Sequence, residues 1–146
     1  MLNDAPAPRT LEDALALLAV GCDKSSTEPS STTTTTASRS IESFETSLAR
    51  GESRFYSFTV TSAGTVNVTL ASVVQQGRSA ALSTPLRIGL GTPEGEGCAV
   101  TDSVEAPPAL TPQLSVTMAA GIHCVSIADS GQISGTVIAT VRFSHL

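Results

Sequence analysis

The chain has 146 residues, which is a length typical of one domain. Hydrophobic residues make up 40% of it and charged residues 14%, and thirteen acidic residues face eight lysines and arginines, which gives a net charge of −5. This balance argues against a nucleic-acid partner, because phosphate binding needs clustered Lys and Arg side chains. No apolar run reaches the ~18 residues that a transmembrane helix requires.

Residues 1–22 have the pattern of a helix that resembles an export signal. The phrase "LEDALALLAV" is rich in good helix formers and ends just before Cys22. Residues 23–40, "DKSSTEPSSTTTTTASRS", contain no large apolar side chain. Such a segment cannot bury enough surface to offset the entropy of ordering it. We therefore expect a helical, signal-like segment followed by a disordered Ser/Thr-rich linker.

From residue 41 onward, apolar and polar residues alternate, which is typical of half-buried antiparallel strands. A short first strand is indicated by Ile41, Phe44 and Leu48. Six later runs alternate more regularly: "RFYSFTV", "GTVNVTL", "PLRIGLG", "QLSVTM", "IHCVSIAD" and "TVIATVRF". The pattern predicts an all-β domain over residues 41–146, folded as an antiparallel β-sandwich of the jelly-roll type.

Glycine-containing phrases between these runs predict the connections. "SAG" at 62–64 and "AAG" at 119–121 predict tight hairpins, and "DSG" at 129–131 begins the last connection. The stretch from about Gly91 to Pro112 lacks alternation and is predicted to be a long irregular loop. Four acids lie in that stretch: Glu94, Glu96, Asp102 and Glu105. They make a solvated acidic loop or, as the alternative, oxygen ligands for Ca²⁺, although their spacing matches no EF-hand.

The phrases "GESRFYSFTVTSAGTVNVTL", "LRIGLGTP" and "AAGIHCVSIADSG", followed by "GTVIATVRF", together resemble the bacterial pre-peptidase C-terminal (PPC) domain. The resemblance covers about two thirds of the chain. It implies an extracellular, jelly-roll-like β-sandwich that serves as an accessory or interaction module and not as a catalyst.

The phrase "LAVGCDKSS" resembles the lipobox of a bacterial lipoprotein, because small residues precede Cys22 and a polar tether follows it. The resemblance implies that Cys22 carries a lipid. The partner would then be a membrane, reached through that anchor, and the location would be the bacterial cell envelope or the exterior. The alternative is a free thiol at the end of an ordinary helix.

The two other cysteines, Cys98 and Cys124, are expected to form a disulfide. Cys124 follows His123, which we place on the core face, so Cys124 should point outward from its strand. Cys98 falls in the long loop, just past a strand end, and a disulfide would pin that loop onto the sheet. In the chain-entropy model, closing such a loop contributes roughly 3 kcal/mol. The alternative is a pair of buried free thiols.

The sequence contains no pattern that indicates catalysis. His123 is expected to be a half-buried sheet residue and His145 to lie in a mobile C-terminus, and no "GxSxG" nucleophile elbow is present. Four ligands at zinc spacing are also lacking, so we expect no catalytic, cofactor-binding or metal-binding residues. The sequence predicts a non-catalytic, extracytoplasmic binding module whose partner is an envelope protein or a polysaccharide. The alternatives are a structural subunit of a surface assembly, joined through strand edges, and, less favoured, a small secreted hydrolase.

Overall fold

The computed structural model describes residues 36–146, so the expected helix over residues 1–22, Cys22, and most of the linker over residues 23–40 lie outside the described part. The described residues form eight strands: β1 (Ser40–Leu48), β2 (Ser53–Val60), β3 (Gly64–Gln75), β4 (Leu86–Glu94), β5 (Gly97–Ala106), β6 (Leu114–Met118), β7 (Gly121–Ala128) and β8 (Val137–His145). Between Thr36 and Leu146 there is no helix long and apolar enough to cross a bilayer.

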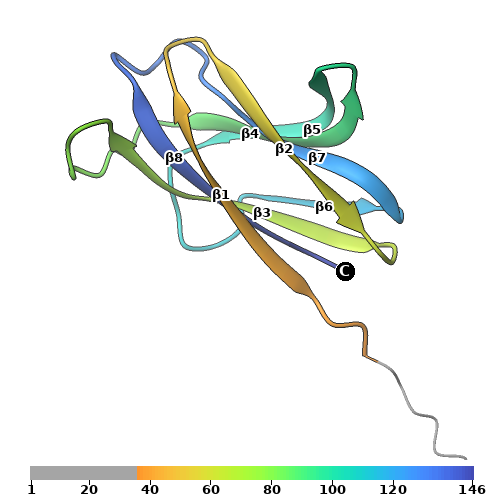
Figure 1. Ribbon diagram of the computed structural model, residues 1–146. Helices are drawn as coiled ribbons and strands as arrows, with labels where there is room; N and C mark the ends of the chain where they lie inside the picture. Colours follow the sequence, from red (N-terminus) through yellow and green to blue (C-terminus); the bar gives the residue numbers. More distant parts are fainter. Residues whose placement is uncertain (1–35) are drawn as a thin grey trace, which may run out of the picture. The chain divides into compact units, whose positions relative to one another are not determined.

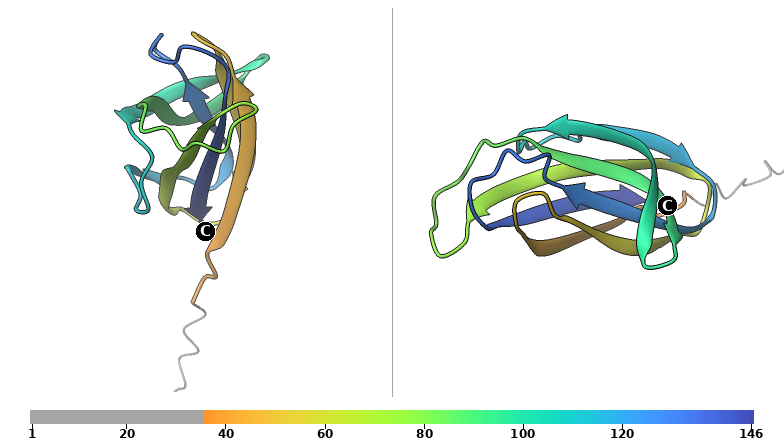
Figure 2. Two further views of the ribbon diagram at one scale, coloured as in Figure 1. Left: turned by 90° about the vertical axis from the view of Figure 1, so that its left-hand side faces the viewer. Right: turned by 90° about the horizontal axis from the view of Figure 1, so that it is seen from above.

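The strands form two antiparallel sheets of four strands each (Figure 1). In the first, here called the β1 sheet, the strand order is β1-β8-β3-β6, and in the second, the β2 sheet, it is β2-β7-β4-β5. Seen from above, the two sheets lie as two layers (Figure 2). The prediction of an all-β antiparallel sandwich is therefore confirmed.

The core between the layers is built from alternate residues of the central strands. In β8, for example, four apolar side chains are buried: Val137, Ala139, Val141 and Phe143. The intervening residues of β8 face outward, as a period of two requires. The first strand is longer than expected and runs along β8 from Ser40 to Leu48. Its first apolar residue, Ile41, points to solvent with 72% of its surface exposed, whereas Leu48 is fully buried.

Two aromatic rings close the side of the sandwich where β1 and β2 form the sheet edges. Phe44 of β1 stacks on Tyr56 of β2, with ring centroids 5.6 Å apart. Tyr56 also lies 5.9 Å from the ring of Phe143. Tyr56 keeps 41% of its surface exposed, because it is part of this edge and not of the deep core.

The predicted hairpins at residues 62–64 and 119–121 are wrong. The first connects β2 to β3 and the second connects β6 to β7, and in both cases the two strands belong to different sheets. Glycine marks a reversal of the chain, but it does not determine which strand the next one pairs with. Among the described strands, only β4 and β5 are neighbours both in sequence and in a sheet.

The predicted irregular loop from Gly91 to Pro112 is also wrong over most of its length. β4 continues to Glu94, and β5 covers Gly97–Ala106. β5 is the edge strand of its sheet, and most of its residues are exposed or half-buried. An edge strand with so little buried surface has no apolar alternation, and for this reason the sequence pattern missed it.

The C-terminus is fixed in the β1 sheet, which corrects the expectation that His145 is mobile. His145 is 4% exposed and pairs along β1 with Ser40. Its Nε2 lies 2.7 Å from Oε1 of Glu42, and its ring packs 5.1 Å from the ring of Phe58. These contacts come from β1 and β2, which are distant in sequence, and sequence reasoning about a terminal residue does not include them.

Candidate functional site

The hairpin formed by β4 and β5 bends back on itself because of a glycine in β4. The pairing of the two strands shifts in register between Leu90 and Gly91. A Cβ atom added to Gly91 would lie 1.9 Å from the carbonyl oxygen of Ala99 and 2.8 Å from Cα of Val100. Only glycine permits this approach of two backbones. The sequence "GLG" in β4 therefore determines the shape of the hairpin.

A disulfide holds the start of β5 close to β7 of the same sheet. Cys98 of β5 and Cys124 of β7 are joined, and their Cα atoms lie 5.9 Å apart. β4 lies between β5 and β7 in this sheet, and in a flat sheet strands separated by a third would be about 9.5 Å apart. The start of β5 thus folds over β4 toward β7, and it crosses where Gly91, the residue paired with Cys124, has no side chain.

The predicted cysteine pair is present, but its surroundings differ from the prediction. Cys98 lies within β5 and not in a loop. Cys124 alternates with the core residues Val125 and His123 and so belongs to the outer face of β7, yet it is fully buried. The hairpin that covers it explains the burial. In the chain-entropy model, a loop of 26 residues closed in this way contributes about 3 kcal/mol.

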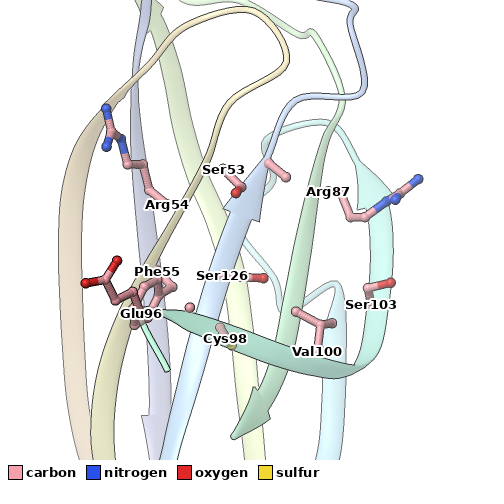
Figure 3. A pocket seen from close by; sticks show the side chains of 11 residues that line it. Ser53, Arg54, Phe55, Arg87, Glu96, Cys98, Val100, Ser103 and Ser126 are labelled. Atoms are coloured by element: carbon pink, nitrogen blue, oxygen red, sulfur yellow. The ribbon is translucent and has the colours of Figure 1, made fainter. Parts of the chain in front are cut away.

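The folded hairpin and the outer face of the β2 sheet enclose a hollow of about 720 Å³ (Figure 3). All four strands of this sheet contribute to it. Its lining consists of Ser53, Arg54, Phe55, Arg87, Glu96, Gly97, Cys98, Val100, Ser103, Ser126 and Ala128. The volume falls within the range of ~300–1,000 Å³ that is typical of ligand pockets.

Hydroxyl groups and two exposed apolar side chains form the central part of the hollow. Ser126 of β7 is half-buried and stands beside Gly89, where an added Cβ would lie 2.9 Å from the serine oxygen. Phe55 of β2 and Val100 of β5 come from the two edge strands, and they expose 40% and 43% of their surfaces. The lining therefore combines hydrogen-bonding groups with apolar surface that water covers in the free protein.

The charged groups at the hollow are largely neutralised by one another. Arg54 contacts Glu52 at 3.1 Å, and Arg87 contacts Glu105 at 3.5 Å. Glu96 also lines the hollow. Two guanidinium groups thus face three carboxylates, so this set carries one net negative charge. The Glu105 carboxylate is held further by the hydroxyl of Ser130, at 3.1 Å, and by the side-chain amide of Gln132.

The four acids that were considered as calcium ligands do not converge. Glu94 is the last residue of β4, Glu96 lies in the turn, and Asp102 and Glu105 lie along β5. Asp102 accepts a hydrogen bond from the hydroxyl of Thr101, and Glu105 pairs with Arg87. In the part of the chain that the structure describes, no three His, Cys, Asp or Glu side chains group together as metal ligands do.

The two histidines lie away from the hollow. His123 is almost fully buried, and its Nε2 lies 2.7 Å from the carbonyl oxygen of Ala119. Its Nδ1 has no hydrogen-bond partner among residues 36–146. Both imidazoles pack against Phe58, at 6.2 Å for His123 and 5.1 Å for His145. Within residues 36–146, neither ring contacts a serine or threonine hydroxyl through a hydrogen bond.

Sequence reasoning found the cysteines near the hollow but missed the residues that line it. Ser53, Phe55, Ser126 and Arg87 occupy outward positions of alternating strands, and such positions ordinarily face solvent. The available signal was the pair Gly89 and Gly91, two positions apart on the outer face of β4. Glycines at that spacing in a strand interior indicate a close backbone approach or a bulge.

Comparison of the chain with models of known protein families and with curated proteins finds no match. The resemblance to PPC domains and to a lipobox therefore rests on the sequence phrases themselves.

Proposed function

We propose that this protein is a non-catalytic, extracytoplasmic binding module that holds its ligand in the hollow on the outer face of the β2 sheet. The observation that carries the proposal is the construction of that hollow. A hairpin shaped by Gly91 and joined to β7 through Cys98–Cys124 forms a wall over a face that would otherwise be open. Because the wall is covalently held, the hollow exists before a ligand arrives, and such preorganisation lowers the cost of binding.

The chemistry of the lining favours binding over catalysis. Its serine hydroxyls have no imidazole beside them, since both histidines pack on Phe58. Its arginines are already paired with glutamates. A serine nucleophile needs an adjacent base within hydrogen-bond reach, and in the described part of the chain no lining serine is hydrogen-bonded to a histidine or a carboxylate. For this reason we rank a hydrolase last.

The strand order supports the jelly-roll class within the sandwich. Two four-stranded sheets, with every connection other than β4–β5 passing from one sheet to the other, agree with that topology. The same arrangement is what the proposed PPC-like nature of residues 41–146 requires.

The disulfide supports an extracytoplasmic location. Structural disulfides persist in oxidising compartments and are rare in the cytosol, and Cys98–Cys124 holds an element of the fold in place. Together with the lipobox-like phrase before Cys22, this supports a bacterial envelope protein tethered by a lipid on that cysteine.

Lipidation of Cys22 is tested by metabolic labelling of the native host with a palmitate analogue. We expect the wild-type protein to carry the label and Cys22→Ala to carry none. A Cys98→Ala, Cys124→Ala double variant, in which Cys22 is the one remaining cysteine of the sequence, controls for label that is attached to other thiols. Equal labelling of wild type and Cys22→Ala, or labelling of neither, would contradict the anchor.

Binding through the hollow is tested by filling it. Ser126→Trp places a large side chain over the sheet between Phe55 and Val100. In a chain that also carries Cys22→Ala, and so lacks the proposed lipid, we expect at least a tenfold loss of retention on the isolated envelope fraction of the host. The matched control is Thr140→Trp. Thr140 is half-buried on the outer face of β8, the corresponding central strand of the other sheet. Unchanged retention of a folded Ser126→Trp protein would contradict the proposed site.

A further inference from the structure

We propose that the ligand of the hollow is a neutral saccharide, presented as part of an envelope polysaccharide. This inference rests on the proposed function, because it takes the hollow as the binding site. It commits to one of the two partners that the sequence leaves open, an envelope protein or a polysaccharide.

The charge of the hollow disfavours anionic and cationic ligands alike. Arg54 and Arg87 form ion pairs with Glu52 and Glu105, so an incoming phosphate or carboxylate would have to displace a carboxylate that is already in place. Glu96 adds a further negative charge at the rim. A strongly cationic ligand would in turn meet the guanidinium group of Arg87, since that of Arg54 is directed toward the carbonyl of Ser47 in β1. A neutral ligand meets none of these repulsions and leaves both ion pairs intact.

The polar groups of the hollow match a ligand that has many hydroxyls. The hydroxyls of Ser53, Ser103 and Ser126 both donate and accept hydrogen bonds. Among the lining residues, the guanidinium of Arg87 adds a donor and the carboxylate of Glu96 adds an acceptor. Two neighbouring sugar hydroxyls can satisfy these groups, since each hydroxyl both donates and accepts hydrogen bonds.

Phe55 supplies the apolar surface on which a sugar ring would pack. Its ring lines the hollow, and 40% of its surface is exposed in the free protein. The C–H face of a pyranose is flat and apolar, and it gains from contact with an aromatic ring as other apolar groups do. Val100 adds a second apolar contact from β5.

The position of the hollow disfavours an extended peptide as the ligand. Peptides that add to a sheet bind along an edge strand, where backbone N–H and C=O groups are free. This hollow lies on the face of the β2 sheet, and its central strands β7 and β4 are paired on both sides. A ligand at this place must be held by side chains, as the hydroxyls of a sugar can be.

The test uses the full chain with Cys22→Ala, which removes the proposed lipid, and the envelope fraction of its host in three portions: untreated, oxidised with periodate, and digested with protease. Periodate cleaves vicinal diols and so destroys most saccharides, whereas protease destroys proteins. We expect periodate to abolish retention and protease to leave it unchanged. Retention that is lost with protease and kept after periodate would overturn the saccharide, while the binding module would stand if Ser126→Trp still blocked retention.

The neutral character of the ligand is tested with polysaccharides released from the envelope and separated by anion exchange. We expect the neutral fraction to bind and the acidic fraction to bind at least tenfold more weakly; the reverse order would overturn the proposal.

The role of Phe55 is tested with the neutral fraction. Phe55→Ala should weaken binding about tenfold, as loss of an aromatic contact does. Ile122→Ala, which is exposed on β7 outside the hollow, should bind as the wild type does. Wild-type affinity of the Phe55→Ala protein would contradict the packing of a sugar ring on Phe55.

Discussion

The carboxylate of Asp129 joins two connections of the sandwich. Its Oδ2 accepts a hydrogen bond from the backbone N–H of Gly51, at 2.9 Å, and its Oδ1 accepts from those of Gln132 and Ile133, at 2.9 and 3.2 Å. Burial by itself would raise the pKa of Asp129, but the N–H donors of Gly51, Gln132, Ile133 and Gly131 together lower it below its ordinary value. The charged form therefore stabilises the turn between β1 and β2 and the start of the connection between β7 and β8.

We predict that Asp129→Asn lowers the free energy of unfolding by about 1–3 kcal/mol near neutral pH, because buried N–H donors lose an acceptor. The carboxyl of Asp129 has a lower pKa in the folded chain than in the unfolded chain. Its contribution is thus complete above the unfolded pKa, about 3.9, and is lost as the pH falls through the folded pKa. Urea denaturation between pH 7 and pH 2 should show the difference between wild type and variant shrink on acidification.

The matched control for this substitution is Asp102→Asn, an exposed carboxylate on β5. It should change the free energy of unfolding by no more than about 0.5 kcal/mol, as is usual at the surface. A difference between wild type and Asp129→Asn that stays constant down to pH 2 would show that the carboxylate does not stabilise the fold through its charge.

At the scale of residues, the sequence predicted which side chains are buried better than it predicted their partners. The alternation in "TVIATVRF" correctly placed Val141 and Phe143 in the core. It gave no sign that Glu42, over a hundred residues earlier in the chain, contacts His145, because that contact follows from the pairing of β1 with β8. Nor did it indicate that Asp129 accepts a hydrogen bond from the N–H of Gly51, because that contact follows from the pairing of β2 with β7.

At the scale of elements, the strands that were predicted well are the ones with a buried face. β3, β7 and β8 alternate clearly and lie inside their sheets. The strand that the pattern misses, β5, lies at an edge and is largely exposed, so its polar sequence predicts a loop. Strand partners were also not predictable, because six of the seven connections among the described strands pass between the sheets, and the sequence of a turn does not specify this.

The shape of the β4–β5 hairpin should fail when Gly91 is replaced. We predict that Gly91→Ala lowers the free energy of unfolding by about 3 kcal/mol, because its Cβ would meet the backbone oxygen of Ala99, and a backbone atom cannot give way as a side chain can. Gly97→Ala, in the same hairpin, is the control: its nearest atom would be 3.8 Å away. Thermal denaturation of both variants measures the difference. Equal midpoints would show that the hairpin does not depend on the close approach at Gly91.

At the scale of the whole molecule, the four edge strands each have a feature that opposes pairing with another chain. β1 carries Glu42 and Glu45, β2 carries Arg54, β6 has only five residues, and β5 is folded over its own sheet. Charges, short length and bending are the usual protections of a sheet edge. They weigh against the alternative in which this protein is a subunit of a fibre joined by strand edges.

We therefore predict that the full chain with Cys22→Ala, which removes the proposed lipid, is a monomer. Size-exclusion chromatography with light scattering should give the mass of one chain, 14.9 kDa for the sequence, over a hundredfold range of concentration. A mass that rises with concentration would support the structural subunit in place of the binding module.

The described domain has its first and last residues at one end and much of its hollow toward the other. Ser40 begins β1 beside His145, and the carbonyl of Leu146 accepts a hydrogen bond from the N–H of Thr61, just after β2 ends (Figure 1). Ser53, which lines the hollow, begins β2 at the opposite end, next to the turn from β1. A surface or a fusion partner joined to either terminus of this domain would therefore leave the hollow open. Immobilising the protein through either terminus is thus compatible with measuring what it binds.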